Sequence, residues 1–88
     1  MEVGEYYKHF KGKNIYKILA TNVTYTGESA GVELNDLVVY QNITNKKIFV
    51  REYAELTEEL SKERQEQYGR KYRIEKLTED ELEELGLK

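Results

Sequence analysis

One stretch of the chain, residues 37–51, limits the fold more than any other. The run LVVYQNI at 37–43 is rich in β-branched and aromatic side chains, and it is followed by the polar TNKK at 44–47 and by IFVR at 48–51. This pattern predicts two antiparallel strands joined by a tight reversal, in which Asn45 tolerates a positive φ angle. The first half of the chain is therefore expected to be β structure.

Two further strands are expected before this hairpin. Tyr6–Phe10 is predicted to be a short strand that ends in a turn at 11–14, and 15–26 is the longest strand candidate. Within 15–26 the apolar positions change parity near Ala20, which predicts a bulge or a sharp bend. The stretch 27–36 carries two glycines and several polar or acidic residues, so we expect a loop there.

The chain changes character after Arg51, where Glu, Lys, Arg, Gln and Leu replace the β-branched residues. Leucines at helical spacing predict one helix over 52–68, and Gly69 is the expected stop. Alternation of apolar and charged residues then predicts a short strand over 72–77.

A second, shorter helix is predicted near the end of the chain. Thr78 and, three residues later, Glu81 form a capping-box pattern, and Gly86 is the expected terminator. The two helices are expected to pack across the strands through four leucines, Leu56, Leu60, Leu82 and Leu85.

Composition excludes several classes of protein and of site. The 88 residues suit a single domain, and the absence of cysteine excludes disulfides, zinc–thiolate sites and thiol nucleophiles. Charged residues interrupt residues 1–20, and no apolar run approaches the length of a membrane span. We therefore expect a cytoplasmic protein that does not associate with membranes.

Charge is distributed unevenly along the chain. Residues 1–51 carry seven basic and five acidic side chains, whereas residues 52–88 carry seven basic and twelve acidic ones, for a net charge of −3. Because phosphate neutralisation supplies most of the affinity for nucleic acids, an acidic chain is a poor default nucleic-acid binder. Binding of nucleic acid through a local basic face on residues 1–51 stays open as an alternative.

Three blocks of residues carry a resemblance to a known family. They are Gly4, Tyr7, His9-Phe10-Lys11-Gly12 and Tyr16-x-Ile18; then Leu37-Val38-Val39-Tyr40-Gln41; then Phe49-Val50-Arg51. In this order the blocks resemble domain-of-unknown-function family 1653, small bacterial proteins with an SH3-type barrel. The resemblance implies a mainly β fold, a small SH3-type barrel of antiparallel strands with a helical C-terminal extension. It implies no activity.

The resemblance also suggests how the chain is organised. We expect one domain over residues 1–88, with the family-like barrel core at 4–53 and a helix, strand and short helix as an extension at 54–88. The family usually has proline where this chain has Glu52, and it carries a His-Ser-Glu-Thr stretch where this chain has no histidine at 24–29. If that stretch contributes to a shared site, the site is altered here.

Some recurrent side chains are not needed to build the barrel, and these are the candidate ligand-binding residues. They are His9, Lys11, Tyr40, Gln41 and Arg51. We expect them to form one face of a binding module for a small polar or anionic ligand, a peptide or a nucleic-acid segment. Arg51 and Lys11 would supply charge and Tyr40 would stack, while the other two would direct the ligand through hydrogen bonds.

Two other classes of function stay open. The first is a small metal-free enzyme with His9 as general base, although neither Ser29 nor Ser61 lies in an activating sequence context. A deep, dry pocket is hard to build in so short a chain, so a binding module is favoured over an enzyme. The second is a structural protein that self-associates through an exposed strand edge. One histidine without cysteine predicts no metal site, and no cofactor motif is present.

Overall fold

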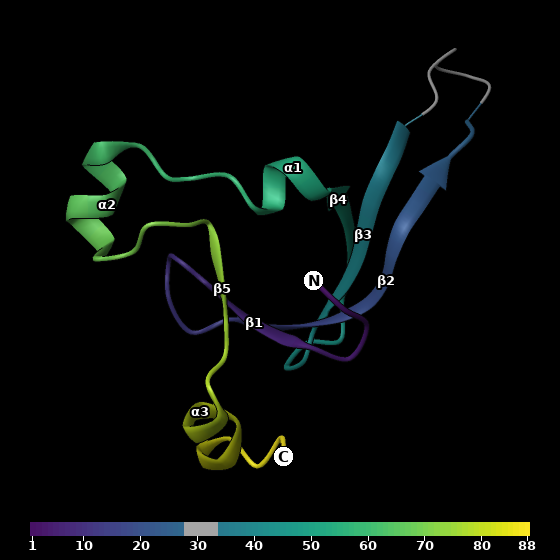
Figure 1. Cartoon of the computed structure of the whole chain (residues 1–88). Helices are drawn as coiled ribbons and strands as arrows, with labels where there is room; N and C mark the ends of the chain where they lie inside the picture. The colour runs from purple at the N-terminus through teal and green to yellow at the C-terminus, as the bar shows by residue number, and fades with distance from the viewer. Residues whose placement is uncertain (28–33) are drawn as a thin grey trace.

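The chain folds into one β-sheet with three short helices, as the computed structural model of residues 1–27 and 34–88 shows (Figure 1). In chain order the elements are β1 (Tyr6–His9), β2 (Ile15–Tyr25), β3 (Leu34–Asn42), β4 (Ile48–Glu52), α1 (Tyr53–Leu56), α2 (Lys62–Tyr68), β5 (Ile74–Lys76) and α3 (Glu79–Glu84). The predicted mainly β class is confirmed. Within the described residues, no helix is long and apolar enough to cross a membrane.

All neighbouring strands of the sheet are antiparallel, in the order β4-β3-β2-β1-β5. In the part of the chain that the structure describes, no pairing joins the edge strands β4 and β5. The sheet is therefore curved but open, and backbone hydrogen bonds do not close the predicted barrel. Of the predicted loop at 27–36, residues 28–33 lie outside the described residues, and Leu34–Asp36 already belong to β3.

The predicted hairpin is confirmed as β3 and β4. The Asn42 N–H donates to the Lys47 carbonyl at 3.0 Å and closes the loop between them. The positive φ angle, 65°, falls on Lys46 rather than on Asn45, where it was predicted. Asn45 holds the turn in another way, because its side-chain oxygen accepts the Lys47 N–H at 2.9 Å.

The predicted parity change in the long second strand is also confirmed. The pairing of β2 with β3 shifts register between Ile18 and Ala20 and again between Ala20 and Val23. Asn22 has a φ angle of 54° at the second shift. These irregularities bend the ribbon of β2 and β3 that dominates Figure 1.

The strand register sends one set of side chains to a common inner face, because residues directly opposite each other in a sheet point the same way. Following the pairs from β4 to β5, this set is Arg51, Phe49, Val38, Tyr40, Ile18, Tyr16, Tyr7, His9 and Ile74. The core lies on this face, where Ile18 and Val38 pack against Leu56 of α1, and all three are almost fully buried.

The prediction of one continuous helix over 52–68 is wrong. The chain leaves α1 after Leu56 and begins α2 at Lys62, with a break between them. Within the break the Leu60 N–H donates to the Lys71 carbonyl at 2.8 Å, a long-range bond that a continuous helix would forbid. Ser61 then starts α2 by accepting the Arg64 N–H at 3.3 Å.

The helix ends follow the sequence signals. Gly69 ends α2 in the left-handed conformation, with a φ angle of 66°. Thr78 and Glu81 form the predicted capping box at the start of α3. The strand expected at 72–77 is present but shorter, as β5.

The predicted leucine contacts of the helices are only partly correct. Leu56 and Leu60 are buried and Leu82 is half-buried, but Leu85 is 51% exposed. Leu77, just before α3, is buried instead. An ion pair between the Lys8 ammonium and the Glu81 carboxylate, 2.8 Å apart, joins α3 to β1.

We expect Leu56→Ala to lower the free energy of unfolding by about 2–5 kcal/mol, the range for truncating a buried leucine. The side chain is the main contribution of α1 to the core, so its loss leaves a cavity against the sheet. Urea denaturation measures the change. Leu85→Ala is the matched control and should change stability by less than about 0.5 kcal/mol. Equal losses in the two variants would contradict the described packing.

Candidate functional site

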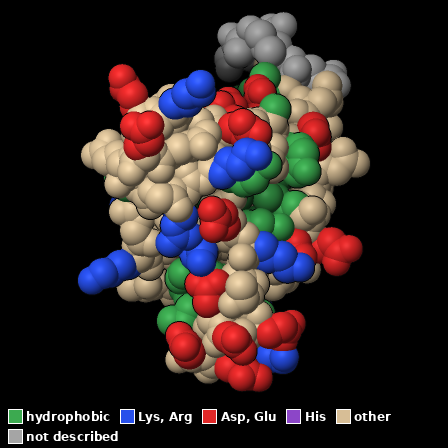
Figure 2. Space-filling view, turned by 60° about the vertical axis from the view of Figure 1, so that its left-hand side comes forward, with side chains coloured by type: hydrophobic (Ala, Val, Ile, Leu, Met, Phe, Trp, Pro, Cys, Tyr) green, Lys and Arg blue, Asp and Glu red, His purple; other side chains and the backbone are tan. Residues whose placement is uncertain are grey.

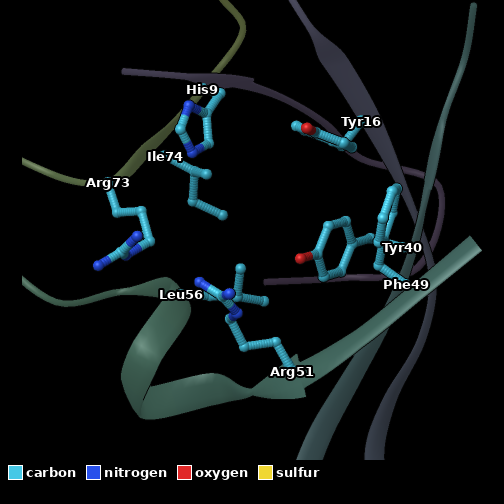
Figure 3. Close-up of a pocket in the computed structure, with 8 residues that line it drawn as sticks. All are labelled: His9, Tyr16, Tyr40, Phe49, Arg51, Leu56, Arg73 and Ile74. Atoms are coloured by element: carbon cyan, nitrogen blue, oxygen red, sulfur yellow. The ribbon is translucent and has the colours of Figure 1, made fainter. Parts of the chain in front are cut away.

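A pocket of about 220 Å³ opens on the inner face of the sheet, beside the core (Figure 3). Every strand and the helix α1 contribute to its lining. The lining residues are His9, Tyr16, Tyr40, Phe49, Arg51, Leu56, Arg73 and Ile74. Because five strands and a helix hold these side chains, the pocket is a product of the whole sheet rather than of one loop.

Three aromatic rings form one wall of the pocket. The rings of Tyr16 and Tyr40 meet edge to face at a centroid distance of 5.2 Å, and Phe49 stacks on Tyr40 at 5.6 Å. Such mutual contacts hold the rings in place. Figure 3 shows both tyrosine hydroxyl groups directed toward the middle of the pocket, which gives this apolar wall two polar groups.

His9 lies across the pocket from Tyr40 and Phe49, and its ring centroid is 6.4 Å from that of Tyr16. Its Nδ1 accepts the backbone N–H of Lys11 at 3.2 Å, so the neutral ring carries its proton on Nε2. Burial lowers the pKa of His9 below its ordinary value of 6.5, and the nearby charges of Arg73, Lys11 and Arg51 lower it further. At neutral pH the ring is therefore an uncharged hydrogen-bond donor in positive surroundings.

Two arginines make the pocket positive, and no aspartate or glutamate is among its lining residues. The guanidinium of Arg51 lies near Leu56 in Figure 3, and its Nε is 3.8 Å from the carboxylate of Glu55. Arg73 lies at the rim, where its guanidinium is paired with the exposed carboxylate of Glu58. Both glutamates lie outside the lining, and Figure 3 shows the Arg73 guanidinium directed away from the middle of the pocket, so Arg51 is the nearer source of positive charge.

The structure brings three of the five sequence-predicted residues together: His9, Tyr40 and Arg51. The other two do not line this pocket. The Lys11 ammonium lies over the ring of Phe10, 5.6 Å from its centroid. Gln41 points to the outer face of the sheet, and its amide nitrogen donates to the Lys46 carbonyl at 3.0 Å.

Sequence reasoning missed two important lining residues, Tyr16 and Arg73. Tyr16 shares parity with Ile18, so the alternation of the second strand was a usable signal. No local signal could identify Arg73. It reaches the pocket because β5 pairs with β1, and its carbonyl accepts the N–H of Phe10 at 3.0 Å.

The arrangement supplies positive charge, hydrogen-bond donors and a stacking surface, but no hydroxyl nucleophile of the serine or threonine type. Ser61 caps α2, and Ser29 lies outside the described residues. In the described ranges, no group of three or more His, Cys, Asp or Glu side chains is placed to hold a metal ion.

The pKa of His9 should rise when Arg73 is replaced by glutamine, because the substitution removes a positive charge that disfavours the imidazolium form. An NMR titration of the single histidine measures this directly. Arg70→Gln is the matched control: Arg70 pairs with Glu75 and lies outside the pocket lining, so the pKa should stay unchanged. The same pKa in both variants would contradict the described electrostatics.

Comparison with known proteins identifies a family but no activity. A search of curated proteins and a search of solved structures found no match. The family model described as protein of unknown function (DUF1653) matches residues 5–76. The match begins just after Gly4, continues past the last motif block and includes α1, α2 and β5, so it covers every lining residue of the pocket and leaves out α3. Since the model spans most of the 88 residues, the chain belongs to the DUF1653 family of proteins of unknown function.

Proposed function

We propose that this protein is a binding module for a small anion that carries a flat apolar group. The observation that carries the proposal is the position of Arg51 and His9 opposite an aromatic wall, in a pocket with no carboxylate in its lining. The guanidinium would pair with the carboxylate or phosphate of the ligand, since arginine recognises such groups through two parallel hydrogen bonds. The Nε2–H of His9 and the Tyr40 hydroxyl would complete the polar contacts.

The size of the pocket supports a compact ligand. Its volume of about 220 Å³ lies below the roughly 300–1,000 Å³ of pockets that hold drug-sized molecules. A single ring with one acidic group suits this space. The flat part of such a ligand would lie against the aromatic wall, and Leu56 and Ile74 would cover its opposite side.

The charges around the pocket support an anion over a cation. An aromatic wall alone would also suit a positively charged ligand through cation–π contacts. Here the positive charges of Arg51 and Arg73 would disfavour such a ligand and favour an anion. The anion would also compete with Glu58 for Arg73, so rim contacts would change on binding.

A peptide or a nucleic-acid segment fits the pocket less well. Single-stranded nucleic acid needs exposed rings on which successive bases can stack. Tyr16 and Tyr40 are half-buried and contact each other edge to face, so they do not form an open platform. The net charge of −3 also disfavours binding of nucleic acid. These ligand classes therefore become outcomes of the binding test rather than parts of the proposal.

Catalysis by His9 receives less support than binding. General-base catalysis needs a proton acceptor of suitable pKa and a second group that acts on the substrate, such as a nucleophile or a general acid. The lowered pKa of His9 keeps the ring neutral, but the lining residues beside it are aromatic, aliphatic or arginine. Such groups hold and orient a ligand.

Benzoate and phenyl phosphate are suitable probes, and each should raise the melting temperature of the wild-type protein increasingly as its concentration exceeds its dissociation constant. For a domain of this size each 1 kcal/mol of binding free energy shifts the melting temperature by about 4–8 °C. Arg51→Gln should abolish the shift and Arg73→Gln should weaken it, whereas Arg70→Gln should keep it. Differential scanning fluorimetry measures the melting temperature of the wild type and of the three variants with and without each probe.

Benzamide, which has a similar ring without the charge, is the ligand control. Equal stabilisation by benzamide, or an unchanged shift in Arg51→Gln, would refute anion binding at this pocket. Binding of either anion should also raise the pKa of His9, because a nearby negative charge favours the imidazolium form. A melting-temperature shift with no change in that pKa would place the anion elsewhere on the protein.

A further inference from the structure

The strand β4 forms an edge of the sheet that the described residues leave uncovered. Residues Ile48, Phe49, Val50 and Arg51 are all exposed, and two of them, Ile48 and Val50, are β-branched residues with 61% and 58% exposure. Hydrophobic side chains also gather in a band on the face of the protein shown in Figure 2, with charged groups around it. An edge strand of this composition is a template for pairing with another strand.

The pairing with β3 determines which backbone groups of β4 face outward. The Asn42 N–H bonds to the Lys47 carbonyl, and the register then matches Phe49 with Tyr40 and Arg51 with Val38. Hydrogen-bonded pairs alternate with non-hydrogen-bonded pairs along an antiparallel ladder. The odd-numbered residues of β4 therefore bond to β3, and the N–H and C=O groups of Ile48, Val50 and Glu52 point outward.

We propose that two copies of this chain pair through β4, antiparallel and centred on Val50. In this register the outward groups of Val50 meet those of Val50 in the second copy, and Ile48 meets Glu52 on each side. Each hydrogen-bonded pair exchanges two bonds, so the three pairs make about six bonds between the copies. A two-fold axis of this kind gives a closed dimer with one continuous sheet.

The charges of the strand favour a second copy as the occupant and select this register. Lys46 and Lys47 precede the strand, whereas Glu52 and Glu55 lie beyond its centre together with Arg51, which is paired with Glu55, so that end carries a net negative charge. Antiparallel pairing with an identical strand therefore places the basic end of each copy beside the acidic end of the other, which is charge complementarity.

Two neighbouring registers would also pair the outward backbone groups of both copies, but they would place like charges opposite each other. Pairing centred on Phe49 would set Lys47 opposite Arg51 of the second copy, and pairing centred on Arg51 would set the two Arg51 side chains opposite each other. Like charges directly opposite destabilise a strand pair. The register centred on Val50 instead sets Arg51 opposite Phe49 of the second copy, where a cation–π contact can form.

This dimer would also extend the candidate pocket. Phe49 and Arg51 both line the pocket, on the inner face of the sheet. Positions opposite each other in a non-hydrogen-bonded pair have Cα atoms about 4.5 Å apart, the closest approach in an antiparallel ladder. The guanidinium of the second copy would therefore lie beside the Phe49 ring and add a positive charge near the pocket mouth.

Sedimentation velocity or light scattering across a concentration series tests the proposal without any ligand. The wild type should approach twice the mass of one chain as concentration increases. Val50→Lys should remain a monomer, because it sets two ammonium groups opposite each other at the axis. Ile48→Lys is the matched variant: the exposed position is similar, but the new ammonium would face Glu52 of the second copy, so the dimer should persist.

Cysteine cross-linking tests the register itself, since the chain has no cysteine of its own. Opposite residues of a hydrogen-bonded pair have Cα atoms about 5.5 Å apart, within the range of a disulfide. Val50→Cys should therefore form a disulfide-linked dimer under mild oxidation. Ile48→Cys should not, because the two copies of that position would lie about 14 Å apart, four residues along the strand.

A wild type that stays monomeric at all concentrations would overturn the proposal. The proposal would also be overturned if Ile48→Lys reduced dimer formation as much as Val50→Lys does. Cross-linking of Ile48→Cys in preference to Val50→Cys would overturn the register. Circular dichroism on each variant confirms that the fold is retained. These outcomes are independent of anion binding, which is read from melting temperatures and from the pKa of His9.

Discussion

The alternation of side chains along paired strands, interrupted only where β2 bends, is the constraint on which this structure depends. One face of the sheet has to supply both a core and a pocket, because an 88-residue chain buries too little surface for separate layers. Ile18 and Val38 fill the part of the inner face that α1 covers, and the larger rings of Tyr16, Tyr40 and Phe49 surround the part it leaves open. A shift of one residue in any strand would exchange these side chains with those of the outer face.

The sequence was informative where structure is decided locally. The hairpin of β3 and β4, the change of parity near Ala20 and the capping box at Thr78 all depend on residues within a few positions of one another. The sequence was misleading where contacts between residues far apart in the chain determine the local structure. Leu56 and Leu60 have helical spacing, yet a backbone bond from Leu60 to Lys71 interrupts the helix. Local propensity is a weak prior against such tertiary contacts.

The same distinction applies to the candidate site. Strand parity was compatible with Tyr40 and Arg51 on one side of the hairpin, but the register of β3 with β4 was needed to place them there, and His9 was a candidate because it belongs to a family-like motif. Arg73 could not be found in this way, since its position depends on the pairing of β5 with β1 across more than sixty residues of sequence. Lys11 was a reasonable candidate by charge alone, but its ammonium lies over the ring of Phe10.

The pairing of β5 with β1 has a consequence for the order in which the protein is made. His9 is synthesised 65 residues before Ile74 (74 − 9), its direct partner in the sheet. Contacts between such distant positions slow folding, because a long loop must close before they form. On a ribosome the hairpin and the aromatic wall can assemble early, but the pocket is complete only when the segment at 73–76 has emerged. The candidate pocket is therefore incomplete in any nascent chain that stops short of β5, whatever part of the sheet has already formed.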